Sequence, residues 1–292
     1  MQFYLSVLTQ TLITIIGVAG VYVLTSLAGM FSLGQAAFMA IGAYASGILV
    51  VKLNWPFLPA AIIAVLISVI IGFFVGLPTV KLRRDYISLV TLGFGEALTA
   101  ILNQMTGLTG GAAGFSGFPK VISFPIVLVV AIICVILVAF FKKSKYGRQC
   151  IALKGDELAA KAMGINVPKV KMIAFLFSVA LVSLSGVLYA FYVTYVDPTL
   201  FGWKLSGEWV IMNFFGGVSS LTGSILSAVI LTALPEMLRF LSDFRMVFYA
   251  VVVLLVLNFK PAGLLGTWEL TPKNVKKLFQ KKKEGTHASS GK

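Results

Sequence analysis

Long apolar runs alternate with short polar segments along almost the whole chain. Five of these runs cover about residues 3–28, 33–51, 57–80, 86–105 and 124–141, and a sixth extends from Met172 to Tyr195. Each is close to the roughly 20 residues that an α-helix needs to cross the hydrocarbon core of a bilayer. The pattern therefore predicts an all-α, polytopic integral membrane protein, and it leaves no room for a large soluble domain.

The region from Glu208 to Leu238 is too long for one ordinary crossing, and Gly216 and Gly217 interrupt it. We expect a short seventh span near 208–215, an eighth near 221–238 and a ninth near 246–259. About eight residues reach only about 12 Å, so a broken or re-entrant helix is the alternative for the seventh. The expected fold is a helical bundle of about eight or nine transmembrane helices, with a membrane domain over residues 1–265 and a basic tail over 266–292.

The charged residues are few and lie where they set the orientation of a membrane protein. Only 12% of the 292 residues are charged, and the formal net charge is +14. Three basic residues lie at 81–84, eight at 142–171 and eight at 260–292, whereas five are scattered over the other segments. By the positive-inside rule, the loop at 142–171 and the carboxyl terminus are cytoplasmic and the amino terminus is outside. We therefore expect contact with membrane lipid and no nucleic-acid partner.

The residues needed for most catalytic or metal chemistry are missing from the spans. The one histidine, His287, lies in the tail, which excludes a zinc site or a histidine base in the membrane domain. Cys134 lies inside an apolar run and Cys150 in the basic loop, so no disulfide between them is expected. The P-loop pattern GxxxxGK[ST] occurs nowhere. We expect no cofactor in this chain, and any ATP that drives it must bind to another protein.

A few polar or flexible positions are candidates for lining a translocation pathway. Glu96 is the one carboxylate well inside an apolar run, where an acidic residue costs roughly 2.5–3.5 kcal/mol on insertion scales. It must face a polar interior or a partner, and a structural hydrogen bond to a neighbouring helix is the alternative to a role in transport. The candidate pathway residues are Ser32, Gln35, Glu96, Gly110, Gly111 and Asn213.

The longest polar segment between two apolar blocks, residues 144–171, contains a predicted short helix. Asp156 is a good N-cap, Glu157 suits the positive end of the helix dipole, and Gly164 followed by Pro168 supplies the stop. A helix of about seven residues is too short to be stable alone in water, so it needs a surface on which to dock.

The sequence GDELAAKAMGINVPK in this segment resembles the cytoplasmic coupling helix of ABC importer permeases, whose pattern is Glu-Ala-Ala, three residues, then Gly. Glu157, Ala159, Ala160 and Gly164 fit that pattern, with Leu158 inserted after the glutamate. Further stretches extend the resemblance, namely SLGQAAFMAIGAY at 32–44, LTGGAAGFSGFP at 108–119, YGRQCIALKGDELAAKAMGIN at 146–166 and GGVSSLTGSILSA at 216–228. Together they are similar to LivM-type permease subunits of branched-chain amino acid ABC importers.

This resemblance implies a transport subunit without an ATPase site of its own, located in the bacterial cytoplasmic (inner) membrane. It implies a heterodimer with a second permease subunit, two cytoplasmic ATPase subunits that bind ATP and magnesium, and an extracytoplasmic substrate-binding protein. We expect Ala162 among the apolar docking contacts and Lys154 and Lys161 at their rim. The residues expected to couple the chain to the ATPase are Arg148, Asp156, Glu157, Leu158, Ala159, Ala160, Met163 and Gly164.

Other functions remain open at the level of sequence. The same importer mechanism could carry urea, short amides or other amino acids, because related permeases share these motifs. An ion-coupled secondary transporter would use Glu96 as its proton site. An intramembrane enzyme is disfavoured, because a single intramembrane carboxylate and no membrane histidine leave no acid–base pair.

Overall fold

The computed structural model describes residues 2–237, 244–260, 262–266 and 268–269. Within these ranges the α-helices are α1 (Gln2–Tyr22), α2 (Gln35–Gly47), α3 (Phe57–Thr79), α4 (Arg84–Gln104), α5 (Thr106–Thr109), α6 (Phe124–Lys143), α7 (Lys145–Gly155), α8 (Glu157–Ala162), α9 (Val167–Val193), α10 (Trp203–Gly216), α11 (Leu221–Met237) and α12 (Arg245–Phe259). The shorter elements are two π-helical turns, η1 (Val23–Leu27) and η2 (Ile48–Lys52), two 3₁₀ turns, η3 (Gly111–Ala113) and η4 (Pro198–Phe201), and the antiparallel strands β1 (Phe115–Ser116) and β2 (Tyr195–Val196).

Six of the helices, two of them lengthened by the π-helical turns, are long and apolar enough to cross a membrane in the described part of the chain. They cover residues 3–27, 35–52, 57–79, 86–104, 124–143 and 167–193, close to the six predicted spans. The helices α10, α11 and α12 are shorter, with 14, 17 and 15 residues. The prediction of a polytopic helical membrane protein is confirmed.

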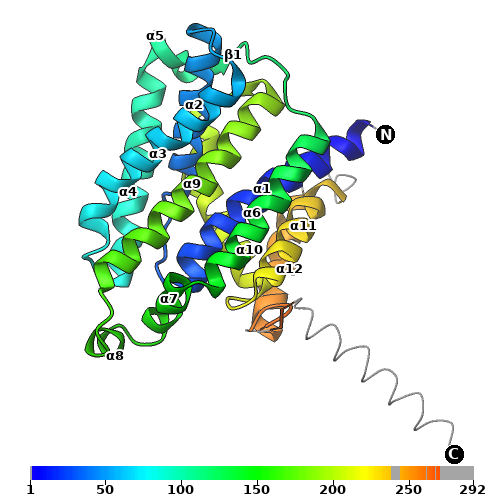
Figure 1. The fold of residues 1–292 in the computed structure, drawn as a ribbon. Helices are drawn as coiled ribbons and strands as arrows, with labels where there is room; N and C mark the ends of the chain where they lie inside the picture. Colours follow the sequence, from blue (N-terminus) through cyan, green and yellow to red (C-terminus); the bar gives the residue numbers. More distant parts are fainter. Residues whose placement is uncertain (1, 238–243, 261, 267, 270–292) are drawn as a thin grey trace, which may run out of the picture.

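Helix α9 lies at the centre of the bundle and packs against α1, α2 and α3 (Figure 1). Its contact with α2 is close because glycines lie at the crossing. A Cβ added to Gly186 would lie 2.0 Å from the carbonyl oxygen of Met39, and one added to Gly42 would lie 2.3 Å from that of Ser183. The hydroxyl of Ser183 also donates to Ser68 of α3 at 2.7 Å. Small residues thus bring three helix backbones together without large side chains between them.

Helices α10 and α11 pack against each other and are separated at the predicted break. The turn between them begins at Gly217, whose φ of +119° is unfavourable for a residue with a side chain. The segment after α12 folds back onto this turn, because the backbone N–H of Leu264 donates to Phe215 O at 2.8 Å and that of Leu265 to Gly216 O at 3.2 Å. Helix α10 takes the place of the predicted seventh span. It is longer than predicted, because it begins at Trp203 and not near Glu208.

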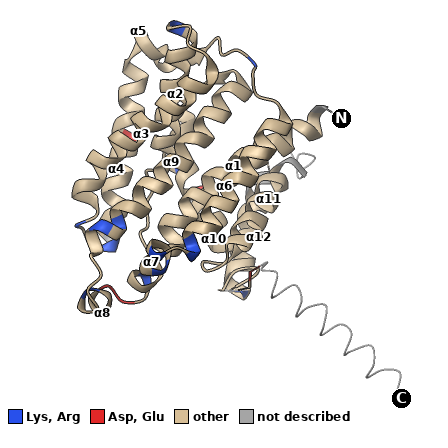
Figure 2. Cartoon of the chain, viewed as in Figure 1, with Lys and Arg blue, Asp and Glu red and all other residues tan. Residues whose placement is uncertain are grey.

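Most of the described basic residues lie at one end of the bundle, which carries the segment 81–84, α7, α8 and the α10–α11 turn (Figure 2). We call this the basic end. Helix α1 begins at the opposite end, where α5 and β1 also lie (Figure 1). The start of the chain and the polar segment 144–166 therefore lie at opposite ends, as the charge pattern predicted. The predicted basic tail, 266–292, lies almost entirely outside the described residues.

The polar segment differs from its prediction in two respects, an additional helix and the start of the sixth span. Residues 145–155 form α7, which we did not predict, and its N-cap Ser144 accepts a hydrogen bond from Gly147 N at 3.2 Å. The sixth span begins at Val167, five residues before the predicted Met172, because Asn166 caps it. Pro168 consequently lies in the first turn of α9, a position that tolerates proline, and does not end the preceding helix.

Candidate functional site

Helix α8 is a short helix that connects α7 to α9 at the basic end. The carboxylate of Asp156 caps it by accepting hydrogen bonds from the backbone N–H groups of Leu158 at 2.8 Å and Ala159 at 3.1 Å. Gly164 follows the helix with a φ of +81°, the left-handed conformation that ends many helices. The predicted cap and the predicted glycine stop are present, whereas Pro168 takes no part in ending this helix, which runs for six residues.

Two large apolar side chains are exposed, one near each end of α8. The side chains of Leu158 and Met163 are 80% and 83% exposed, whereas Ala160 is buried against the bundle. Ala159 is exposed on the same helix, and Arg148 is exposed on α7. Large apolar side chains exposed next to a basic rim are typical of a surface that binds another protein.

An ion pair attaches α8 to the spanning helix α9. The Nζ atom of Lys171 lies 2.8 Å from Oε1 of Glu157, and the Lys171 side chain is only 3% exposed. A buried ammonium group requires such a partner, because its desolvation costs several kcal/mol. Glu157 therefore contacts its own chain in this structure. Sequence reasoning missed Lys171, which it counted as a loop charge.

A second cation connects α7 to the interior of the basic end. The Nζ atom of Lys154 donates to Ser26 O at 2.9 Å and to Val218 O in the α10–α11 turn at 3.4 Å. Burial, followed by the nearby charges of Lys142 and Arg84, lowers the pKa of Lys154. The expectation that Lys154 lies at the rim of a docking surface is wrong, because its side chain points into the bundle.

Lys142 holds the same turn from the end of α6. Its Nζ atom donates to the Tyr22 hydroxyl at 2.8 Å and to Ser219 O at 2.9 Å. It also pairs with the carboxylate of Glu269, which in turn accepts from the backbone N–H of Leu221 at 3.2 Å. Lys142, which precedes the polar segment, and Lys154, which lies within it, thus fix the α10–α11 turn, and no local sequence signal pointed to either contact.

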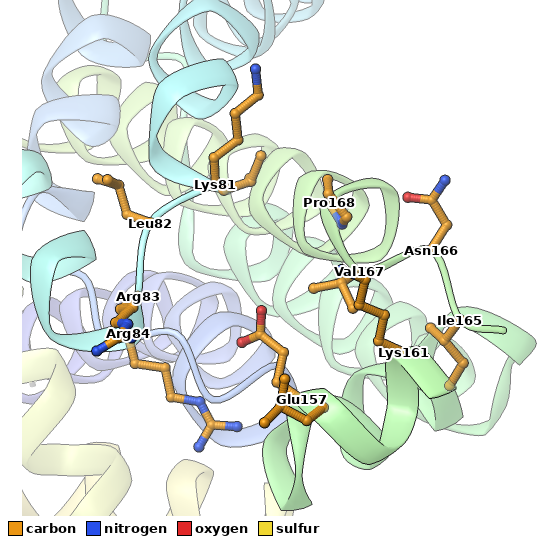
Figure 3. Close-up of a pocket in the computed structure, with 12 residues that line it drawn as sticks. Lys81, Leu82, Arg83, Arg84, Glu157, Lys161, Ile165, Asn166, Val167 and Pro168 are labelled. Carbon is orange, nitrogen blue, oxygen red and sulfur yellow. The ribbon is translucent and has the colours of Figure 1, made fainter. Parts of the chain in front are cut away.

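Beside α8, a cavity of about 940 Å³ separates the α3–α4 connection from α8 and the start of α9. Figure 3 shows Lys81, Arg83 and Arg84 on one side of it and Glu157 and Lys161 on the other. Arg84 donates to the backbone oxygens of Leu153 and of Lys154, the latter at 2.9 Å, and thereby links the start of α4 to α7.

The candidate pathway residues do not form one constellation. Ser32 and Gln35 are buried, and the Gln35 amide donates to Ser32 Oγ at 3.3 Å and accepts from Ser178 Oγ of α9 at the same distance. Asn213 is buried separately, where its Nδ2 donates to Trp209 O at 2.9 Å and to Val18 O of α1 at 3.4 Å. Both amides therefore make hydrogen bonds between helices of this chain, while the buried Oδ1 of Asn213 has no hydrogen-bond partner among the described residues.

Glu96 is different, because it is exposed on α4. Its Oε1 accepts a hydrogen bond at 3.4 Å from the backbone N–H of Trp203, the first residue of α10. A carboxylate at that position interacts favourably with the positive end of the helix dipole. Gly110 and Gly111 have a different role from Glu96. Their φ values of +77° and +60° allow the backbone to turn between α5 and η3.

Comparison with known proteins identifies the class of membrane protein. Residues 3–257 match the family model described as the permease component of branched-chain amino acid transport systems. The chain belongs to this permease family. Two relatives, the high-affinity branched-chain amino acid transport permeases LivM of Salmonella typhimurium (strain LT2) and Escherichia coli (strain K12), are each 30% identical over 291 residues. In both cases 88% of this chain and 68% of the relative are covered.

One of the similar proteins is named for a different cargo. The ribose import permease protein RbsC of Haemophilus influenzae is 25% identical over 268 residues, which cover 86% of this chain and 82% of the relative. Because the names of the relatives state both amino acids and a sugar, membership of the family does not by itself assign a substrate to this permease.

Both cysteines of this permease are buried and free of disulfides. Burial raises the pKa of the Cys150 thiol, on α7, to about 12. Since the thiolate is the reactive form, Cys150 is unreactive near neutral pH. A cysteine introduced on the exposed face of α8 is therefore a selective site for chemical labelling.

Proposed function

We propose that this chain is the membrane subunit of an ATP-binding cassette importer that moves branched-chain amino acids inward by alternating access, driven by separate ATPase subunits. The observation that carries the proposal is α8, a capped and anchored helix with Leu158 and Met163 almost fully exposed. A helix this short keeps its shape only when it is attached to a scaffold. Its exposed apolar side chains suit a groove on a partner, and the resemblance of its sequence to a coupling helix supports an ATPase subunit as that partner.

The attachments of α8 supply a route for movement. The ion pair with Lys171 connects α8 to α9, and Lys154 connects the adjoining α7 to the α10–α11 turn. A displacement of α8 by the ATPase would therefore act on the spanning helix α9 and on the turn between α10 and α11. Alternating access requires such rigid connections, because packed helices shift as units between two states.

The proposal includes the partners and the orientation. ATP and magnesium bind to two ATPase subunits at the basic end, which is cytoplasmic in a bacterial inner membrane. A second permease subunit completes the pathway, and an extracytoplasmic binding protein delivers the amino acid. This chain itself holds no cofactor and performs no catalysis. Glu96 is the pathway candidate with the most accessible side chain, since Ser32, Gln35 and Asn213 are buried within the chain.

The test is ATP-driven uptake of radiolabelled leucine by proteoliposomes that contain the complete importer. Replacing Leu158 and Met163 together by aspartate should lower uptake about tenfold or more, because placing carboxylates in an apolar groove weakens binding by at least that factor. Capture of leucine by the binding protein should be unchanged. The exchange Leu158→Met with Met163→Leu keeps the apolar surface and serves as the matched control. Unimpaired uptake by the double aspartate variant would refute the proposal.

The cargo and the energy source are tested in the same vesicles. Valine and isoleucine should compete with leucine, and competition by urea, a short amide or ribose instead would reassign the cargo. Uptake driven by a proton gradient in the absence of ATPase subunits, and abolished by Glu96→Gln, would favour the secondary transporter.

A further inference from the structure

The cavity between the α3–α4 connection and α8 has an unbalanced charge. Lys81, Arg83, Arg84 and Lys161 line it, together with one described carboxylate, Glu157. That carboxylate is already paired with Lys171, so it does not neutralise the four cations. The side chains of Lys81, Arg83 and Lys161 make no hydrogen bond or ion pair within the described residues. A volume of about 940 Å³ with this lining suits an anionic group of considerable size.

The cavity also has apolar walls and lies at a particular depth. Val80, Leu82 and Ile165 contribute to its lining beside the cations. It begins directly after α3 ends at Thr79 and before the spanning part of α4 begins at Tyr86. Cations at the ends of spanning helices lie at the level of lipid headgroups.

An apolar stripe on α3 leads away from the cavity into the membrane region. Phe73 and Leu77 are exposed and lie four residues apart, on one face of α3, which ends at Thr79, two residues before Lys81. Phe74 beside them is exposed too. A ligand with an anionic head and a hydrocarbon tail would contact both features at once, whereas a free anion would use only the cavity.

We propose that this cavity binds the phosphate headgroup of an anionic phospholipid, whose acyl chain lies along Phe73 and Leu77. The guanidinium of Arg83 and the ammonium groups of Lys81 and Lys161 donate to the phosphate oxygens. Such a lipid bridges the α3–α4 connection and α8, and so influences the position of the proposed docking helix. The binding itself does not depend on the ATPase, and a failure of the coupling proposal would leave it intact.

Native mass spectrometry of the purified full chain tests the site. The protein is titrated with phosphatidylglycerol or with phosphatidylcholine of the same acyl chains. We expect one phosphatidylglycerol to be retained in preference to phosphatidylcholine. Lys81→Gln combined with Arg83→Gln should weaken retention about fivefold per charge removed and thus about 25-fold. Lys143→Gln combined with Lys145→Gln removes the same charge from exposed positions at the same end and should leave retention unchanged.

Other results would overturn the assignment. Equal retention of the two lipids, no effect of the cavity variant, or an equal effect of the control variant would show a non-specific basic surface. Inorganic phosphate is the control for an ion site. If it displaced the lipid at millimolar concentration, and alone raised the melting temperature as much as phosphatidylglycerol does, the cavity would be an ion site. Unchanged lipid retention by the cavity variant, together with weaker binding of the ATPase subunits when the importer is assembled with that variant, would show a protein contact. Unchanged melting of both variants confirms that they are folded.

Discussion

At the scale of single residues, the ion pair between Glu157 and Lys171 changes the interpretation of the coupling motif. The motif suggested that Glu157 faces a partner. In the structure it faces Lys171, whose ammonium group is almost completely buried. Its contribution is then to hold α8 in place, and the exposed apolar side chains remain for docking.

Glu157→Gln should destabilise the chain by about 1–2 kcal/mol. Removing the partner of a buried charge costs more than that, but the Glu157 side chain is 39% exposed and water screens part of the effect. Unfolding of the purified chain measures the change. Glu157→Gln combined with Lys171→Met should recover most of the loss, since no unpaired charge is left. Equal destabilisation by the single and the double variant would show that the pair has no structural role.

At the scale of elements, the crossing of α2 and α9 depends on the absence of a side chain at Gly186. A methyl group there would lie 2.0 Å from the Met39 carbonyl oxygen, so the two helices must separate. Gly186→Ala should therefore cost about 1–3 kcal/mol and lower the melting temperature in detergent. Gly93→Ala on α4 is the control, because the added group would meet no other part of the described chain within 4 Å beyond its own helix backbone and neighbours, and alanine favours a helix. Equal melting of the two variants would contradict the close crossing.

The connection from α7 to the α10–α11 turn is a second prediction at this scale. Lys154→Met removes the donor to Ser26 O and Val218 O, which should cost about 1–2 kcal/mol and reduce amino-acid uptake several-fold. The ATPase should still bind and hydrolyse ATP, because α8 is unchanged. Lys143→Met, at an exposed position, is the control. A variant that transports normally would exclude Lys154 from the route of movement.

The sequence predicted the long elements well and the short ones poorly. Apolar runs of membrane length define spans directly, so six spans were placed nearly correctly. Helix α7 was missed because its few buried residues, including Cys150 and Leu153, are diluted by charges. Ser144 as an N-cap, and Asn166 followed by Pro168, were the local signals that would have placed the starts of α7 and α9.

At the scale of the whole molecule, the distribution of charge predicted that the start of the chain and the polar segment lie at opposite ends. Contacts between distant segments were not predictable. Lys154 and Val218 are 64 residues apart in sequence, and Lys142 and Ser219 are 77 apart. These pairs meet only because the bundle places the end of α6 and α7 against the α10–α11 turn. The candidate pathway residues likewise follow helix packing, which buries Gln35 and Asn213 and leaves Glu96 exposed.

The central claim, that α8 docks on an ATPase, is tested most directly by chemical cross-linking in membranes that contain the whole importer. Met163→Cys introduces an exposed thiol, while the native Cys134 and Cys150 are buried. We predict that a thiol-to-amine cross-linker joins Met163→Cys to an ATPase subunit, and that Lys120→Cys, on the exposed stretch between β1 and α6, gives no such product. A Met163→Cys variant that is labelled but never cross-linked to the ATPase, or a product from Lys120→Cys, would contradict the account.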